Sequence, residues 1–257
     1  MTNNSTNNSF GKFVWFEYVS KQAPKAQGFF GELFGWKKQD VPMPGGDYTM
    51  IALGDRTIGG YLDTPEGVPT QAHWLTHLRV ANADAAAAKV KSLGGTIMKE
   101  PFKVGEFGTM AIAIDPHGGA FALWQPAKTE PDAAPSDHAF CWNELYSKDP
   151  AASVAFYSAV GGFTVKQQDM PGMGAYYVLE AGGQPRAGIM ASPMPQAPHA
   201  WLPYVAVANA DATADKAKRL GATSLVPPTD IPGVGRFSII VDPQGATIGI
   251  LQAEAQG

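Results

Sequence analysis

The chain has 257 residues, of which 16% are charged, and its formal net charge is −4. Two domains are expected because the length exceeds the roughly 100 to 200 residues of one domain, and the lack of Lys- or Arg-rich runs excludes nucleic acid and anionic membranes as partners. No apolar run reaches the roughly 18 residues of a membrane span, and the single Cys141 with no secretory pattern at the N-terminus predicts a reducing, cytoplasmic setting.

The first half of the chain opens with a polar segment, followed by a strand and a helix. Residues 1–9 are almost entirely Asn, Ser and Thr, and this composition predicts a disordered tail. Alternating apolar side chains predict a strand over residues 13–20, and the apolar spacing changes to the helical period over residues 23–34. Two β-prone runs, 48–53 and 57–62, then predict antiparallel strands.

A second series of elements begins near His73. Residues 75–80 are predicted as a strand, and residues 84–93 as an Ala-rich helix that a glycine pair closes. A hairpin is predicted from runs 109–114 and 120–124. The sequence therefore predicts two successive βαβββ modules in this half.

The second half repeats the first after 127 positions (242 − 115). Asp115-Pro116-His117-Gly118 returns as Asp242-Pro243-Gln244-Gly245, and Ala81-Asn82-Ala83-Asp84 returns as Ala208-Asn209-Ala210-Asp211. Asp84 and Asp211 are predicted to cap the helices that follow them. We predict domains over residues 10–126 and 138–254, joined by a Pro- and Ala-rich linker over residues 127–137.

These motifs together resemble the vicinal oxygen chelate superfamily, which includes glyoxalases, bleomycin-resistance proteins and extradiol dioxygenases. The resemblance rests on Asp-Pro-x-Gly in a final hairpin, aromatic pairs in the first helix of each half, and Ala-Asn-Ala-Asp before the second helix. It covers about residues 10–252. It implies an α+β fold of tandem duplicated glyoxalase-like domains, each of two βαβββ modules with a curved, mostly antiparallel sheet.

The resemblance also implies where a divalent metal would bind. Metal-dependent relatives carry His, Gln or Glu on the first strand of each module and a carboxylate in the pattern Asp-Pro-x-Gly-x-x-x-Glu. In this sequence the carboxylate position falls on Ala122 and Gly249. The usual first-strand ligand positions fall on Trp15, Trp142, Leu75 and Leu202. None of these side chains is a metal ligand.

Four polar or acidic side chains lie two residues further along these strands and share one face. They are Glu17, His77, Glu144 and Tyr204, which we take as the candidate catalytic residues. A carboxylate repeated on an aromatic-rich strand could act as a general base, or it could accept hydrogen bonds and fix the module interface. No cofactor is expected; the alternative is a divalent metal in the first domain, held by Glu17, His77 and Asp63.

Aromatic side chains near this face could line a pocket for a planar or apolar ligand, although such residues at strand spacing usually belong to the core. They are Trp15, Trp142, Trp74, Trp201, Tyr48 and Tyr176.

The predicted function is that of a small-molecule enzyme, a glyoxalase-like lyase or isomerase that transfers a proton at a carbonyl compound. Two alternatives stay open. The chain could be a non-catalytic protein that binds a small molecule or an antibiotic, or a structural protein in which aromatic side chains fill the concave pocket of each curved sheet. The partner is expected to be a small-molecule ligand, and the chain a monomer or a homodimer.

Overall fold

The computed structural model describes residues 10–43, 46–64, 71–128, 132, 134–170, 174–193 and 197–254. The predicted disordered tail, residues 1–9, lies outside the described residues, as does part of the predicted linker. Within the described ranges, no helix is long and apolar enough to cross a membrane.

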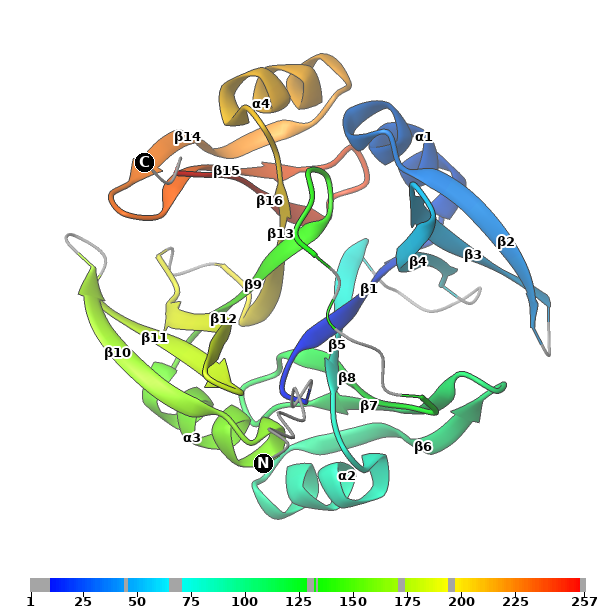
Figure 1. Ribbon diagram of the computed structural model, residues 1–257, viewed down its shortest axis with the longest axis vertical. Helices are drawn as coiled ribbons and strands as arrows, with labels where there is room; N and C mark the ends of the chain where they lie inside the picture. The colour runs from blue at the N-terminus through cyan, green and yellow to red at the C-terminus, as the bar shows by residue number, and fades with distance from the viewer. Residues whose placement is uncertain are drawn as a thin grey trace, which may run out of the picture. The chain divides into compact units, whose positions relative to one another are not determined.

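Four modules with the same order of elements follow one another along the chain (Figure 1). The first contains β1 (Phe13–Ser20), α1 (Ala23–Phe34), β2 (Lys37–Met43), β3 (Gly46–Leu53) and β4 (Arg56–Asp63). The second contains β5 (His73–Arg79), α2 (Ala83–Ser92), β6 (Thr96–Val104), β7 (Gly108–Ile114) and β8 (Ala120–Pro126). The predicted βαβββ order of the first half is confirmed.

The second half repeats this series. The third module contains β9 (Phe140–Ser147), α3 (Pro150–Gly161), β10 (Thr164–Met170), β11 (Gly174–Ala181) and β12 (Gln184–Ala191). The fourth contains β13 (Ala200–Ala206), α4 (Ala210–Arg219), β14 (Thr223–Ile231), β15 (Gly235–Val241) and β16 (Thr247–Ala253). The duplicated α+β fold is therefore the predicted one.

Each half of the chain contributes one eight-stranded sheet. The strand orders are β2-β3-β4-β1-β5-β8-β7-β6 and β10-β11-β12-β9-β13-β16-β15-β14. Pairing is antiparallel along the three consecutive strands of a module, whereas the first strand of each module pairs in parallel with the last. Because this parallel pair closes every module, residues of first and last strands lie side by side.

The helices of the first and second modules begin and end for different local reasons. Helix α1 has Pro24 in its first turn and ends at Gly35, whose φ of 73° is the left-handed conformation that favours glycine. Helix α2 is capped by Asn82, whose side chain accepts a hydrogen bond from Ala85 N at 2.7 Å.

The fourth module caps its helix in the same way, since the side chain of Asn209 accepts from Ala212 N at 2.8 Å. The prediction that Asp84 and Asp211 cap these helices is therefore wrong. An N-cap residue needs an extended backbone, which Asn82 has. Both aspartates lie within the first turn, where they favour the helix through its dipole.

Contacts between Cα atoms divide the chain into two compact units that interleave in sequence. Among the described residues, unit 1 comprises those within 1–14, 77–134 and 143–201, and unit 2 comprises those within 15–76, 135–142 and 202–257. Unit 1 thus holds most of the second and third modules, where α2 packs against α3, and unit 2 holds most of the first and fourth, where α1 packs against α4. The domain boundaries proposed from the sequence describe the repeat and stay a prediction.

Candidate functional site

In unit 2 the candidate base Glu17 forms a pair with a tyrosine. Glu17 lies on β1 with 6% of its surface exposed, and its Oε1 accepts a hydrogen bond from Tyr48 Oη at 2.7 Å. The indole of Trp15 donates to the same hydroxyl at 3.1 Å. Burial and the adjacent carboxylate raise the pKa of Tyr48 far above its usual value, so its hydroxyl remains the donor throughout the physiological range.

Unit 1 contains the counterpart of this pair. Glu144 on β9 is 7% exposed, and its Oε1 accepts from Tyr176 Oη at 2.8 Å. Trp142, the counterpart of Trp15, is half-buried. Two of the predicted catalytic residues and two of the predicted aromatic residues are thus brought together as carboxylate–tyrosine pairs, one in each unit.

A glycine beneath each tyrosine makes the pairing sterically feasible. Gly60 on β4 stands opposite Glu17, and Gly188 on β12 stands opposite Glu144. A Cβ at position 60 would overlap the hydroxyl of Tyr48, and a Cβ at position 188 would overlap that of Tyr176. Sequence reasoning missed both glycines, although the repeat places them at matching positions.

The even-numbered modules carry the other two predicted catalytic residues. His77 on β5 is 4% exposed and stands opposite Ala122. Tyr204 on β13 is 5% exposed and stands opposite Gly249, where a Cβ would overlap its ring. The register confirms that the positions after the Asp-Pro turns adjoin the first strands, and it shows that Tyr204 covers one of them.

The donor set at these positions does not fit a divalent metal centre of the kind that the family resemblance implies. Ala122 and Gly249 offer no ligand atom. Asp63, the proposed third ligand, accepts a hydrogen bond from Ala23 N at 3.2 Å. In the described part of the chain, no group of three or more His, Cys, Asp or Glu side chains is arranged to hold a metal ion.

The remaining predicted ligand-binding residues, Trp74 and Trp201, are buried and contact other aromatic side chains. Trp74 in unit 2 is 6% exposed and packs edge-on against Tyr18, with ring centroids 5.1 Å apart. Trp201 in unit 1 is 5% exposed and donates from its indole to Tyr157 Oη at 2.9 Å. Their burial favours the interpretation of these two residues as core.

The aspartate of each Asp-Pro turn is buried and accepts a tyrosine hydroxyl from within its own unit. In unit 1, Asp115 Oδ2 accepts from Tyr157 Oη of α3 at 2.9 Å. In unit 2, Asp242 Oδ2 accepts from Tyr18 Oη of β1 at 2.6 Å. The two donors are not counterparts, because the repeat aligns Tyr157 with Phe30.

A buried histidine that sequence reasoning missed completes the network of unit 1. His199 Nε2 lies 2.7 Å from Asp115 Oδ2, and both side chains are 1% exposed. Burial alone would raise the pKa of Asp115, but hydrogen bonds from His199 and from Gly119 N hold it below its usual value. In unit 2 burial prevails and raises the pKa of Asp242, despite the hydrogen bond from Tyr18.

The fold and these sites define a tandem protein of paired βαβββ modules with a carboxylate on the first strand of each half. The profile of the Glyoxalase/Bleomycin resistance protein/Dioxygenase superfamily matches residues 12–123 and residues 136–250. The chain belongs to this superfamily.

Two curated relatives span nearly the whole chain. The "Putative glyoxylase CFP32" of Mycobacterium tuberculosis is 36% identical over 247 residues, which cover 94% of this chain and 95% of the relative. The "Anthracycline biosynthesis protein DnrV" of Streptomyces peucetius is 29% identical over 261 residues. The match covers 94% of this chain and 93% of the relative.

Solved structures of the same fold include enzymes. A Mn(II)-bound glyoxalase from Novosphingobium aromaticivorans is similar with a TM-score of 0.64 at 17% identity, covering 95% of this chain and 82% of that one. The 2,2',3-trihydroxybiphenyl 1,2-dioxygenase of Sphingomonas wittichii is similar with a TM-score of 0.66 at 12% identity. The match covers 96% of this chain and 93% of that one. At these identities the likeness establishes the fold.

Proposed function

We propose that the protein is a glyoxalase-like lyase or isomerase that transfers a proton at a carbonyl compound without a metal. The observation that carries the proposal is the buried carboxylate–tyrosine pair, which occurs in both units with the same glycine beneath it. A carboxylate held in one orientation is suited to general base catalysis. The name of the mycobacterial relative, a glyoxylase, agrees with this class of reaction.

The proposed step involves only the carboxylate and the substrate. The carboxylate of Glu17 or Glu144 removes a proton from the carbon next to a carbonyl group, and the electron pair of the C–H bond moves onto the carbonyl oxygen as an enolate. In an isomerisation, the carboxylic acid then returns the proton to the former carbonyl carbon, while the proton of the hydroxyl on the first carbon moves to the enolate oxygen. In a lyase reaction, the enolate re-forms the carbonyl group, a C=C bond forms, and the leaving group departs from the next carbon with the electron pair and takes the proton from the carboxylic acid. The tyrosine donates a hydrogen bond that orients the carboxylate. Tyr48 stays protonated, because burial and the neighbouring Glu17 raise its pKa above the usual value.

Exchange of substrate hydrogen for deuterium in D₂O tests this proposal directly. Hydroxyacetone and the hemithioacetal of methylglyoxal serve as probes, with exchange followed by NMR. The Glu17→Gln, Glu144→Gln double variant should lose about 10²- to 10⁴-fold of the exchange rate, which is the usual contribution of a general base. Unchanged exchange in that variant would refute the proposal.

Chelation separates this mechanism from a metal-dependent one. Treatment with EDTA followed by dialysis should leave the exchange rate unchanged, because Ala122 and Gly249 supply no ligand. Loss of exchange that only Mn²⁺ or Zn²⁺ restores would show instead that a metal takes part.

One observation favours a second function, the non-catalytic binding of a planar small molecule. Tyr204 covers Gly249, so one of the two turn-carboxylate positions is occupied by an aromatic ring. The anthracycline biosynthesis relative concerns a polycyclic aromatic product, which is compatible with such a ligand. Saturable quenching of tryptophan fluorescence by a planar aromatic probe, without turnover and equal in the Glu17→Gln, Glu144→Gln variant, would favour binding over catalysis.

A further inference from the structure

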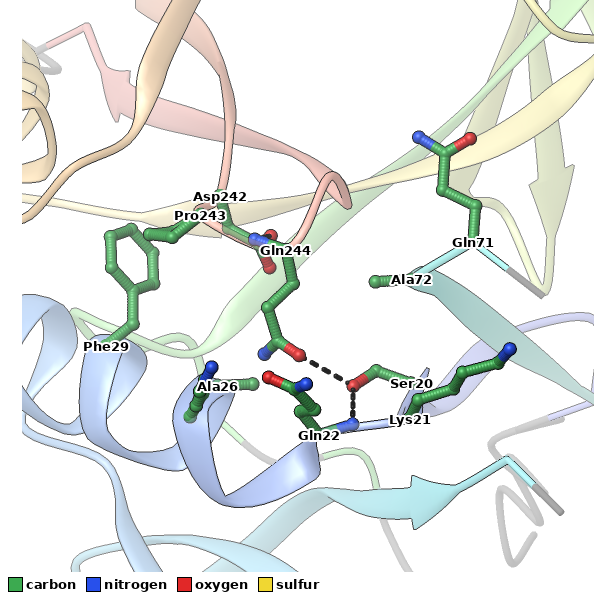
Figure 2. A pocket seen from close by; sticks show the side chains of 11 residues that line it. Ser20, Lys21, Gln22, Ala26, Phe29, Gln71, Ala72, Asp242, Pro243 and Gln244 are labelled. Carbon is green, nitrogen blue, oxygen red and sulfur yellow. Dashed lines mark hydrogen bonds between the residues drawn. The ribbon is translucent and has the colours of Figure 1, made fainter. Parts of the chain in front are cut away.

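Unit 2 contains a cavity of about 450 Å³ that does not include the Glu17–Tyr48 pair (Figure 2). It lies where the end of β1 and the first turns of α1 meet the second Asp-Pro turn. Its walls include Ala26 and Phe29 of α1, Ala72 ahead of β5, and Asp242 and Gln244 of the turn. A volume of this size is typical of small-molecule sites.

The repeat shows how the same place is filled in unit 1. The shift of 127 positions aligns Ala72 with His199 (199 − 72), whose imidazole is held between two groups. The backbone N–H of Lys148 donates to Nδ1 at 3.2 Å, and Nε2 lies 2.7 Å from Asp115 Oδ2. Because a backbone N–H is always a donor, Nδ1 is the acceptor. Nε2 therefore carries the ring proton and donates a hydrogen bond to Asp115 Oδ2.

The polar groups that surround this imidazole have counterparts around the cavity of unit 2. Asp242 corresponds to Asp115, and Lys21 corresponds to Lys148. Asp242 and Lys21 both line the cavity. Within the described residues, Asp242 Oδ2 accepts one side-chain hydrogen bond, from Tyr18, whereas Asp115 Oδ2 accepts two. A carboxylate oxygen has two lone pairs, so Asp242 can accept another N–H.

A second polar group of the cavity wall needs a partner. Gln244 Oε1 accepts from Ser20 Oγ at 2.9 Å, as Figure 2 shows. Its Nε2 is buried and has no hydrogen-bond partner in the described part of the chain. A buried donor without an acceptor is unfavourable, and an acceptor atom on a ligand would satisfy it.

The charges at the cavity indicate what else the ligand carries. The side chains of Lys21 and Lys25 line the cavity and are exposed to solvent. The cavity is larger than one five-membered ring, so a ligand that fills it has a substituent beyond the ring. Two ammonium groups favour an anionic substituent over a cationic one.

We propose that this cavity binds a small molecule that carries an azole ring and an anionic group. The ring N–H donates to Asp242 in the place that His199 takes beside Asp115, and the anionic group lies against Lys21 and Lys25. This site is independent of the proposed catalytic pair and extends the function beyond it.

Titration with imidazole and imidazole-4-acetate, followed by two-dimensional NMR of the full-length protein, tests the proposal. Imidazole should bind with an affinity of about millimolar, as expected of a ligand of five heavy atoms. Imidazole-4-acetate should bind about two- to fivefold more tightly, since exposed ion pairs add little, and histamine more weakly than imidazole-4-acetate.

Matched variants locate the binding. Ala72→His should abolish it because the new imidazole occupies the cavity as His199 does, whereas Ala72→Ser should retain it. His199→Ala should create a second imidazole site in unit 1 and serves as the positive control. Asp242→Asn should weaken binding at least tenfold.

Three results would overturn the proposal: binding that persists unchanged in Ala72→His, no saturable binding by the native chain under conditions in which His199→Ala binds imidazole, or tighter binding of histamine than of imidazole-4-acetate. The Glu17→Gln, Glu144→Gln variant should bind the probes like the native chain. Failure of this proposal and failure of the proposed catalysis are therefore distinguishable.

Discussion

At the scale of single residues, two glycines determine whether the candidate base is oriented. Tyr48 reaches Glu17 across β4 at Gly60, where any side chain would overlap its hydroxyl. The sequence shows the two glutamates directly, because a repeated acidic residue on an aromatic strand is conspicuous. It does not show the glycines, because a residue without a side chain has no polarity or periodicity to read.

We expect Gly60→Ala to displace Tyr48 and to lower the free energy of unfolding by about 1–3 kcal/mol, which is typical of overpacking. Urea unfolding measures this change. Gly28→Ala is the matched control: a Cβ at Gly28, within α1, meets nothing within 4 Å, so this change should stabilise by about 0.5–1 kcal/mol. Equal loss in both variants would contradict the steric explanation.

The pKa values of the two turn aspartates are shifted in opposite directions from the usual value. Their contributions to the free energy of unfolding should therefore depend on pH in opposite ways. Asp115 has a lowered pKa, so its contribution to stability is present above the unfolded-state value near 4 and is lost as the pH falls through the folded value. Asp242 has a raised pKa, so its ionisation opposes folding above that same unfolded-state value.

The stability lost in Asp115→Asn should therefore increase from about pH 3 to pH 6, whereas the loss in Asp242→Asn should shrink over the same range. Thermal unfolding of the three proteins between pH 3 and pH 7 gives both curves. Parallel curves for the two variants would contradict the opposite shifts of the two pKa values.

At the scale of elements, the sequence predicted the strands that are buried on at least one face and missed those at the sheet edges. The run 13–20 became β1, and the run 23–34 became α1, as predicted. Strands β2 and β6 were not located, because all their side chains are exposed or half-buried and show no apolar alternation. An edge strand pairs on one side alone, so its sequence can be polar throughout.

The residues of the candidate site were likewise predicted only in part. Glu17 and Glu144 were predicted, whereas their tyrosine partners were predicted as pocket walls, since hydrogen bonds between strands leave no mark in spacing. His199 was missed, although comparison with Ala72 across the repeat would have found it.

The helix starts offer a test at this scale. Asn82→Ala and Asn209→Ala should each lower the free energy of unfolding by about 1 kcal/mol, because each removes the acceptor of a first-turn N–H. Asp84→Asn and Asp211→Asn should have smaller effects, about 0.3–1 kcal/mol, through the helix dipole. Chemical unfolding distinguishes them, and a larger effect of the aspartates would restore them as the caps.

At the scale of the whole molecule, the compact units draw on both halves of the duplication. Unit 2 combines the first and fourth modules, and unit 1 combines the second and third. Each half of the chain therefore holds one part of each unit, and neither half holds a complete one.

A fragment of residues 1–134 should consequently form a homodimer, in which each copy supplies the module that the other lacks. Light scattering after size-exclusion chromatography gives the mass. Co-expression with residues 135–257 should produce a 1:1 complex instead, with the near-ultraviolet circular dichroism of the intact chain. A folded monomeric fragment would contradict the interleaved arrangement.

The tyrosine donors of the Asp-Pro turns come from non-equivalent positions of the repeat. Unit 2 takes its hydroxyl from β1 (Tyr18) and unit 1 from α3 (Tyr157), and the counterparts of these residues, Leu145 and Phe30, carry no hydroxyl. A dimer of either half would still bring one tyrosine to each aspartate. The same requirement, a hydroxyl for a buried turn carboxylate, is thus met from two different positions of the module.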